Sequence, residues 1–319
     1  MALPPRYGGT ASGEILVLNS SRIGLVGLGN MGNPVAARLI QRGHRLLAYD
    51  ANAAQLSSAS ALGADVAGSA SEVAQGCQTV LLSLPNPAVV REVVGALIER
   101  GTPGLVIVDL STNDPQTARD LDRSAVARNM YYVDAPISGG PSRALTGELT
   151  LMVGGNEQAV QGIRALLSDL GTQVEHVGPA GSGSIAKLLN NFVALWGMVG
   201  VSQAFLAAEA LDVSLDRLYE VMSRSSGRSY SLDRNFPKIR NQDFSPKFTL
   251  TLAEKDLRLG LDLMRSVGLK AFAETDLRSL FDVAAQSDAE MDVAVIHERL
   301  RRSSASLAGP IGATKQERR

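Results

Sequence analysis

The chain has 319 residues, which is enough for two domains with cores of their own. Its net charge is −1 and its aromatic content is 4%, so no basic excess or base-stacking surface indicates binding to nucleic acid or to an anionic membrane. The single cysteine, Cys77, excludes an internal disulfide framework and fits a reducing compartment, so we expect a cytoplasmic protein.

The two ends of the chain differ from the rest in composition. Residues 1–21 have neither a cationic start followed by an apolar run nor an amphipathic pattern, so a flexible extension is expected rather than a signal or transit peptide. Residues 304–319 are small and then charged, which predicts a disordered tail.

From Arg22 onward, short apolar runs alternate with helical stretches. Strands are expected at 23–26, 45–49, 65–67, 79–84, 105–109, 131–133, 149–153 and 173–176. Helices are expected between them, at 30–42, 53–62, 70–75, 87–100, 115–128 and 156–169. This alternation predicts a parallel sheet covered on both faces, in an α/β domain of Rossmann type over residues 22–182.

After Gly183 the strand signals vanish. Helices are expected near 184–211, 214–224, 249–267, 270–285 and 292–301. They predict an all-α C-terminal domain over residues 183–303, which would serve substrate binding and oligomerisation.

A glycine-rich loop follows the first strand and opens the first helix, which is the context that G-x-G-x-x-G requires for binding a dinucleotide. The loop consists of Gly27, Leu28, Gly29, Asn30, Met31 and Gly32. The helix N-terminus would supply free N–H groups to the phosphates.

Asp50 ends the second strand, where a carboxylate accepts hydrogen bonds from the adenosine ribose and repels a 2′-phosphate. No arginine stands at Ala51 or Asn52, so NAD is favoured over NADP as the cofactor. The alternative is a plain glycine turn, with an Asp that caps the next helix.

Three further loops carry small polar residues at the ends of strands. Ser83-Leu84-Pro85 and Leu110-Ser111-Thr112 lie where a cofactor would pass, but either loop could equally cap a helix. Ser138, Gly139 and Gly140 leave backbone N–H groups uncovered, so they could form a nest for a carboxylate or simply an ordinary loop.

The run GSGSIAKLLNN, residues 181–191, places Lys187 within an apolar helix, where Ser184 could be the cap. Lys187 and Asn191 lie four apart and share a face, so together they could grip a hydroxyl or carbonyl oxygen. The ammonium could then pass a proton as hydride moves. The alternative is a lysine that snorkels from a buried helix to the surface.

The helix that carries Lys187 is apolar all round. It is expected to be shorter and more interrupted than a membrane span, and to lie buried between domains or subunits of a homodimer or homotetramer.

Two other polar clusters stand out. Lys255 and Asp256 could contact a cofactor or lie on a solvated face, and Arg228 could bind a second carboxylate or lie on the surface. The histidines form no metal-binding pattern, so no metal is expected.

Taken in order, four motifs resemble those of the β-hydroxyacid dehydrogenase family, which includes 3-hydroxyisobutyrate dehydrogenase, and the resemblance covers residues 22–303. They are GLGNMG for the cofactor, DAPISGG for the substrate, GSGSIAKLLNN for catalysis and KDLRLGLD for a late cofactor contact. The resemblance implies that Lys187 is the catalytic lysine and that Asn191 helps to hold the substrate. It also implies that Ser138, Gly139 and Gly140 bind the carboxylate end of the substrate.

The same resemblance implies that Lys255 touches the cofactor near the nicotinamide, and that Leu84, Pro85 and Thr112 line the NAD site. The expected protein is therefore an NAD-dependent oxidoreductase that moves hydride between NAD+ and a short 3-hydroxy acid bearing a carboxylate, with Lys187 as general acid and base. Two alternatives remain. One is a reductase of tartronate, succinic or sulfonated semialdehyde, and the other is a non-catalytic dinucleotide-binding sensor.

Overall fold

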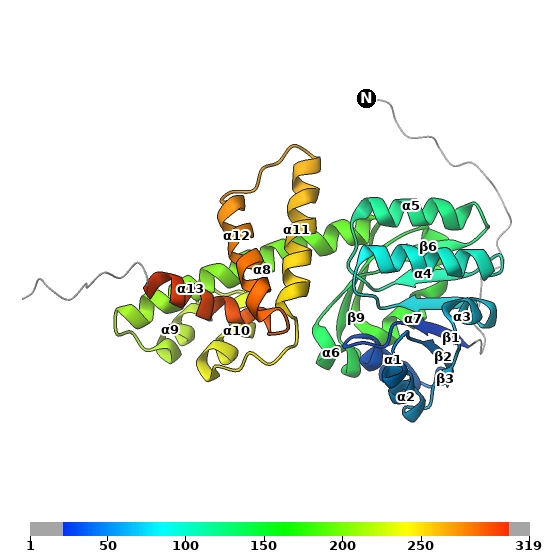
Figure 1. Ribbon diagram of the computed structural model, residues 1–319, viewed down its shortest axis with the longest axis horizontal. Helices are drawn as coiled ribbons and strands as arrows, with labels where there is room; N and C mark the ends of the chain where they lie inside the picture. Colours follow the sequence, from blue (N-terminus) through cyan, green and yellow to red (C-terminus); the bar gives the residue numbers. More distant parts are fainter. Residues whose placement is uncertain (1–21, 306–319) are drawn as a thin grey trace, which may run out of the picture.

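The computed structural model describes residues 22–305. The extension expected at residues 1–21 lies outside this range, as does most of the expected tail. The last helix, α13 (Ile296–Ala305), continues two residues past the predicted start of that tail. The chain forms two lobes along its longest axis, an α/β lobe and a helical lobe (Figure 1).

The α/β lobe is built on a nine-stranded sheet of order β3-β2-β1-β4-β5-β6-β8-β7, with β9 paired to β8. The first six strands in chain order are β1 (Ile23–Val26), β2 (Leu46–Tyr49), β3 (Asp65–Val66), β4 (Thr79–Leu82), β5 (Val106–Asp109) and β6 (Tyr131–Asp134). These six are parallel to one another, and their order is that of a dinucleotide-binding sheet.

The prediction of a wholly parallel sheet is wrong beyond β6. The last strands are β7 (Ile137–Ser138), β8 (Leu149–Gly154) and β9 (Gly171–Gly178), and β8 runs antiparallel to both β6 and β7. The helix before β8 is α6 (Gly140–Thr146), with seven residues. At about 1.5 Å per residue it is too short to carry the chain back along a six-residue strand, so β8 enters in the opposite direction.

Helices cover both faces of the sheet and enclose two separate apolar cores (Figure 1). One face carries α1 (Gly32–Gln41), α2 (Ala53–Ala61), α6 and α7 (Glu157–Leu170). The other face carries α3 (Ala70–Gly76), α4 (Pro87–Arg100) and α5 (Pro115–Val126). The central strands β1, β4 and β5 are buried along their whole length, which explains their near-continuous apolar runs.

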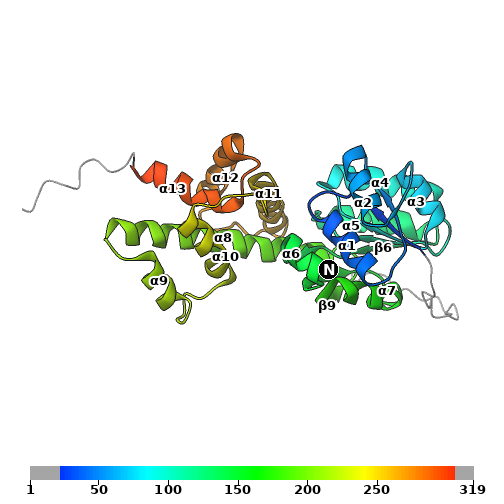
Figure 2. The same ribbon diagram turned by 90° about the horizontal axis from the view of Figure 1, so that it is seen from below.

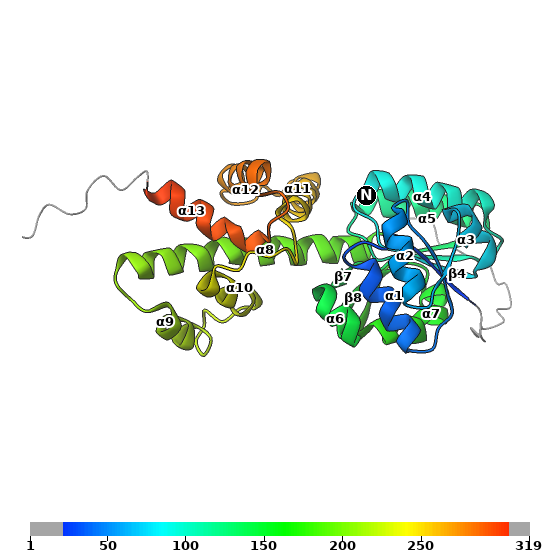
Figure 3. The ribbon, with the colours of Figure 1, turned by 60° about the horizontal axis from the view of Figure 1, so that its bottom comes forward.

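The helical lobe begins with α8 (Ser182–Ala210), a helix of 29 residues. It starts against β6, β8 and β9 and runs out through the second lobe, where it packs on α10, α11 and α13 (Figures 2 and 3). The remaining helices are α9 (Leu215–Met222), α10 (Tyr230–Asn241), α11 (Leu250–Ser266) and α12 (Glu274–Asp288), followed by a 3₁₀ turn at Val293–Val295 and by α13. Their core includes Phe205 and Phe281, both fully buried.

The expectation that α8 is too short and interrupted for a membrane span is wrong. By length and composition alone, α8 is the one helix in the described part of the chain that could cross a membrane. This rests on an 18-residue apolar stretch of the helix, of which 39% is buried within the protein.

The sheet ends at Gly178 and α8 begins at Ser182, so we infer a domain boundary between these residues, next to the predicted one.

Candidate active site

The glycine loop follows β1 at the edge where β1 and β4 lie side by side and their connections leave in opposite directions. Gly27 has a φ of +92°, and a Cβ there would lie 2.2 Å from the carbonyl oxygen of Ser83. A Cβ on Gly32 would lie 1.9 Å from the carbonyl oxygen of Gly27, whereas one on Gly29 would meet nothing within 4 Å. The loop is thus closed by two glycines and leaves open space above the third.

Free backbone N–H groups beside this space come from residues 29–32, since within the described chain the N–H of Asn33 donates to the carbonyl oxygen of Gly29 and Pro34 has no N–H. Met31 is at the N-cap position, and no side chain caps the helix. The side chain of Asn33 donates to the carbonyl oxygen of Leu28 at 2.5 Å and so holds the loop against α1. An uncapped helix N-terminus on a glycine turn attracts a phosphate, because its N–H groups and dipole both face the ligand.

Asp50 lies after β2 and holds the same loop. Its Oδ2 accepts the N–H of Leu28 at 2.7 Å, and its Oδ1 accepts the N–H of Asn52 at 2.8 Å. The cap of the next helix is Asn52, whose side chain accepts from Ala54. Asp50 is therefore not a helix cap. Its position suits the ribose of a dinucleotide, and this set of residues fits NAD.

The loops after β4 and β5 meet beside the glycine loop. The hydroxyl of Ser111 accepts the N–H of Leu84 at 2.9 Å and joins the two loops. The caps of the following helices are Asn86 for α4 and Asp114 for α5. The small polar residues of both loops are thus not helix caps, which leaves Leu84, Pro85 and Thr112 at the edge of the predicted cofactor site.

A buried carboxylate that the sequence analysis did not single out fixes the second of these loops. Asp109 ends β5, is 1% exposed, and accepts hydrogen bonds from Ser111 N–H, Asn113 Nδ2 and Tyr132 Oη at 2.9, 2.5 and 2.7 Å. Burial raises its pKa above the usual value, although these hydrogen bonds oppose the shift. The sequence signal that could have identified this carboxylate is an Asp at the end of a strand, followed by Ser111 and Asn113.

The Ser138–Gly140 turn joins β7 to α6. Gly139 and Gly140 have φ values of +137° and +76°, and a Cβ on Gly140 would meet nothing within 4 Å. No side chain caps α6. The turn therefore presents uncovered backbone N–H groups, as a carboxylate nest requires.

The start of α8 is fixed by a carboxylate from the sheet. Asp134, at the end of β6, accepts the N–H groups of Gly181 and Ser184 at 2.8 and 2.7 Å and the hydroxyl of Ser184 at 2.9 Å. The expectation that Ser184 caps the helix is wrong. Its hydroxyl donates to Asp134. The acceptor that caps the helix is therefore the carboxylate of Asp134, which lies 47 positions before Gly181 in the chain.

Lys187 lies one turn into α8 and is 8% exposed, so its ammonium does not snorkel to the surface. It forms no hydrogen bond or ion pair with another side chain in the described part of the chain. Burial lowers its pKa, and the positive charges of Lys255 and Arg234 lower it further, while the charge of Asp256 raises it. A buried amine with a lowered pKa is suited to proton transfer near neutral pH.

Asn191 is held at one side of Lys187 by α11. Its Nδ2 donates to Asp256 Oδ2 at 2.6 Å, and its Oδ1 accepts from Asn190 Nδ2 at 3.2 Å. The other oxygen of Asp256 lies 3.2 Å from Lys255 Nζ. The Asp256 carboxylate thus orients an amide on α8 and an ammonium on α11 at the same time.

Lys255 also reaches the α/β lobe, because its Nζ donates to the carbonyl oxygen of Thr112 at 3.1 Å. The candidate catalytic groups of the helical lobe therefore face the carboxyl edge of the sheet, where the glycine loop lies. Arg228 is exposed and lies in the loop before α10. Arg234 of α10 adds a further positive charge that acts on Lys187, and the sequence analysis missed it.

Comparison with known proteins agrees with this arrangement. Residues 22–178 match the family model described as the NAD binding domain of 6-phosphogluconate dehydrogenase. Residues 181–299 match the one described as NAD-binding of NADP-dependent 3-hydroxyisobutyrate dehydrogenase.

Individual relatives cover most of the chain. A probable 3-hydroxyisobutyrate dehydrogenase of Mycobacterium tuberculosis is 32% identical over 291 residues, which is 89% of this chain and 99% of that protein. The 2-(hydroxymethyl)glutarate dehydrogenase of Eubacterium barkeri is 34% identical over 247 residues, 76% of this chain and 82% of that one. The structure of the M. tuberculosis 3-hydroxyisobutyrate dehydrogenase with L-serine superposes with a TM-score of 0.83 at 31% identity, covering 89% of this chain and 100% of that one.

Proposed function

This chain belongs to the β-hydroxyacid dehydrogenase family and is an NAD(P)-dependent hydroxyacid dehydrogenase, and from that premise we propose that it oxidises a short 3-hydroxy acid similar to 3-hydroxyisobutyrate. The observation that carries the proposal is Lys187, a buried lysine that forms no ion pair within residues 22–305 and lies one helical turn before the oriented Asn191. The names of the relatives support a small hydroxy acid as the substrate.

When bound, NAD+ would supply the acceptor for the hydride from the hydroxyl carbon of the substrate. The Ser138–Gly140 turn holds the carboxylate of the substrate through its backbone N–H groups. Neutral Lys187 takes the hydroxyl proton as the C=O bond forms, and its lowered pKa increases the neutral fraction. In the reverse direction, protonated Lys187 returns that proton to the carbonyl oxygen.

Asn191 and Lys255 have positioning and binding roles in this proposal. One N–H of the Asn191 amide is used by Asp256, so the second is left for the oxygen of the substrate. Lys255 lies between Asp256 and the carbonyl oxygen of Thr112, and this contact with the loop after β5 supports a role in holding the nicotinamide end of the cofactor. We propose NAD rather than NADP, because the carboxylate of Asp50 would repel a 2′-phosphate.

A substrate panel tests the function. Oxidation of 3-hydroxyisobutyrate, L-serine and glycerate would be compared with reduction of tartronate, succinic and sulfonated semialdehydes, each with both cofactors. We expect the highest kcat/KM for 3-hydroxyisobutyrate or a C2-substituted analogue with NAD+. A higher kcat/KM for one of the aldehydes would assign the protein as a semialdehyde reductase instead.

Two lysines, Lys187 and Lys255, give a matched test of the mechanism within the same assay. Lys187→Met should lower kcat by about 10²–10⁴-fold, the usual contribution of a general acid or base, and leave the Kd for NADH unchanged. Lys255→Met should raise the Kd for NADH, measured by nucleotide fluorescence. Full turnover in Lys187→Met, or loss of NADH binding in that variant, would contradict the assigned role.

A further inference from the structure

Tyr132 is a fully buried tyrosine whose hydroxyl group contacts the end of β5. Its side chain packs in the core between the sheet and α3, α4 and α5, so it lies out of reach of a ligand at the edge of the sheet. Its hydroxyl donates to Asp109 Oδ2 at 2.7 Å. Burial and the charge of Asp109 raise the pKa of Tyr132 well above its usual value, so the phenol keeps the proton that it donates. Because a buried hydroxyl costs free energy unless it is paired, a tyrosine here serves a partner that a phenylalanine could not.

The partner of Tyr132 holds the loop that follows β5, residues 110–113. Asp109 Oδ1 accepts the N–H of Ser111 at 2.9 Å. Asp109 Oδ2, the oxygen that Tyr132 contacts, also accepts Nδ2 of Asn113 at 2.5 Å. The carboxylate thus fixes the residues on either side of Thr112. A buried charge is costly unless it is hydrogen-bonded, and the Tyr132 hydroxyl supplies one of the hydrogen bonds that offset this cost.

The loop 110–113 connects three parts of the cofactor site. Ser111 Oγ accepts the N–H of Leu84 at 2.9 Å, which ties it to the loop after β4. The carbonyl oxygen of Thr112 accepts Lys255 Nζ at 3.1 Å, which ties it to α11. Because β1, β4 and β5 are adjacent and parallel, the loop lies at the carboxyl edge of the sheet, beside the glycine loop. The conformation of the loop therefore also sets the positions of Leu84 and Lys255.

We propose that Tyr132 is a positioning residue for the nicotinamide cofactor, which holds the loop 110–113 in its binding conformation through Asp109 and touches neither cofactor nor substrate. A network of buried hydrogen bonds has few ways to relax when one donor is lost, so the loop and its contact with Lys255 should both loosen. The inference rests on the NAD site and does not depend on the proposed substrate.

Two neighbouring tyrosines of β6 form a matched pair for the test. Tyr131→Phe is the control, since its side chain is partly buried and packs against the core on the opposite face of the sheet. Tyr132→Phe should raise the Kd for NADH, measured by nucleotide fluorescence, by about two- to tenfold, as for the loss of one hydrogen bond. The KM for NAD+ should rise by a similar factor, and kcat at saturating concentrations should fall by less. Tyr131→Phe should leave all three constants unchanged.

Two double variants separate positioning from a general loss of packing. Lys255 acts on the same loop, so combining Lys255→Met with Tyr132→Phe should raise the Kd for NADH by less than the product of the single effects, by a factor of about two or more. Asp50 follows β2, which β1, β4 and β5 separate from β6. The effects of Asp50→Ala and Tyr132→Phe should therefore multiply. The melting temperature of each variant reports its folding.

A second variant keeps the test open if Tyr132→Phe does not fold. Asn113→Ala removes the other donor to Asp109 Oδ2 from a side chain that is itself 1% exposed, and should raise the Kd for NADH in the same direction. Unchanged NADH binding in the folded variants of Tyr132 and Asn113, or an equal change in Tyr131→Phe, would overturn the inference.

The remaining outcomes distinguish this inference from the proposed function. Effects of Tyr132→Phe and Lys255→Met that simply multiply would show that the two residues act independently, and would overturn the inference. A wild type that binds NADH but oxidises no 3-hydroxy acid would overturn the proposed substrate, and the Kd values would still decide the role of Tyr132.

Discussion

The carboxylate of Asp134 links the sheet to the helix that carries Lys187. It is 1% exposed and accepts three hydrogen bonds from the first turn of α8, yet burial raises its pKa from 3.8 to about 6. Desolvation therefore outweighs the hydrogen bonds, and the charged form is held in place at a cost in stability. We therefore expect the stability of the junction between β6 and α8 to depend on pH through this one residue.

The sign of this coupling can be measured with Asp134→Asn. Because the pKa in the folded state is raised, the stabilising contribution of Asp134 is fully present below about pH 4 and is lost as pH rises through about 6. A shift from 3.8 to about 6 corresponds to about 3 kcal/mol. Denaturant unfolding at pH 4 and pH 7 should therefore show the wild type losing about this amount relative to the variant. A difference that is independent of pH, or that has the opposite sign, would contradict the assignment.

At the scale of elements, the sequence predicts what is periodic and misses what depends on contacts. The glycine loop, Asp50 and α8 were expected because their signals are local. The helix α10 was missed, since Pro237 lies inside it and its sequence is mostly polar. It forms because Ser229 caps its start and because Leu232 and Ile239 bury against the helical core. Arg234, which lies on α10, could not be placed without that helix.

The junction of α8 with the sheet depends on a second contact that sequence periodicity does not reveal. A Cβ on Gly183 would lie 2.3 Å from the carbonyl oxygen of Met152 and 2.5 Å from that of Asp134. Both atoms belong to the backbone and cannot move aside as a side chain would. The glycine therefore sets how closely α8 approaches the strands, and with it the position of Lys187.

Two helical glycines test this role. Gly183→Ala should lower stability by about 1–3 kcal/mol through overpacking, and should lower kcat because α8 is displaced. Gly162→Ala, inside α7, is the control, since a Cβ there would meet nothing within 4 Å. It should stabilise the helix by up to about 1 kcal/mol and leave kcat unchanged. Thermal unfolding and steady-state kinetics measure both, and equal behaviour of the two variants would exclude a packing role for Gly183.

At the scale of the whole molecule, the site exists because two lobes meet. The α/β lobe supplies the glycine loop and Thr112, and the helical lobe supplies Lys187 and Lys255. The order of the motifs along the chain predicts both lobes, but not the contact between Lys255 and the carbonyl oxygen of Thr112 that joins them. That contact depends on how α11 crosses α8, which is fixed by side-chain packing rather than by periodicity.

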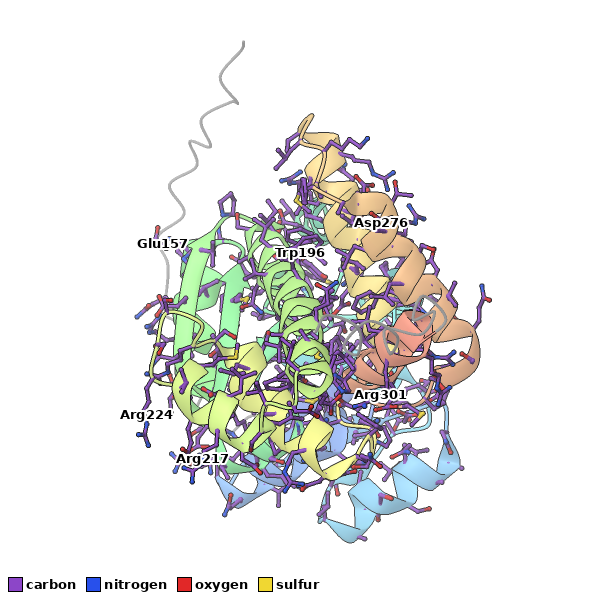
Figure 4. The ribbon with its side chains drawn as sticks, turned by 90° about the vertical axis from the view of Figure 1, so that its left-hand side faces the viewer. Glu157, Trp196, Arg217, Arg224, Asp276 and Arg301 are labelled. Atoms are coloured by element: carbon purple, nitrogen blue, oxygen red, sulfur yellow. The ribbon has the colours of Figure 1, made fainter. Side chains whose placement is uncertain are left out.

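The outer face of α8 argues for a second copy of the chain. Leu189, Val193 and Trp196 are 42%, 69% and 38% exposed, and their spacing of four and three residues places them on one face of the helix; Figure 4 labels Trp196 on it. A contiguous apolar face of this kind on an otherwise charged protein is typical of a subunit interface. We therefore expect a homodimer or homotetramer in which these residues are covered.

Sedimentation velocity of the wild type should accordingly show a dimer or tetramer. The double variant Val193→Glu with Trp196→Glu should shift the assembly toward the monomer, because two buried carboxylates would face an apolar partner. Val283→Glu on α12 changes another exposed valine, 55% exposed, and should leave the assembly intact. Since α8 also has the length and composition of a membrane span, flotation with phosphatidylcholine vesicles provides the opposing test. A wild type that sediments as a monomer, or that floats with the vesicles, would show that something other than a second copy covers this face.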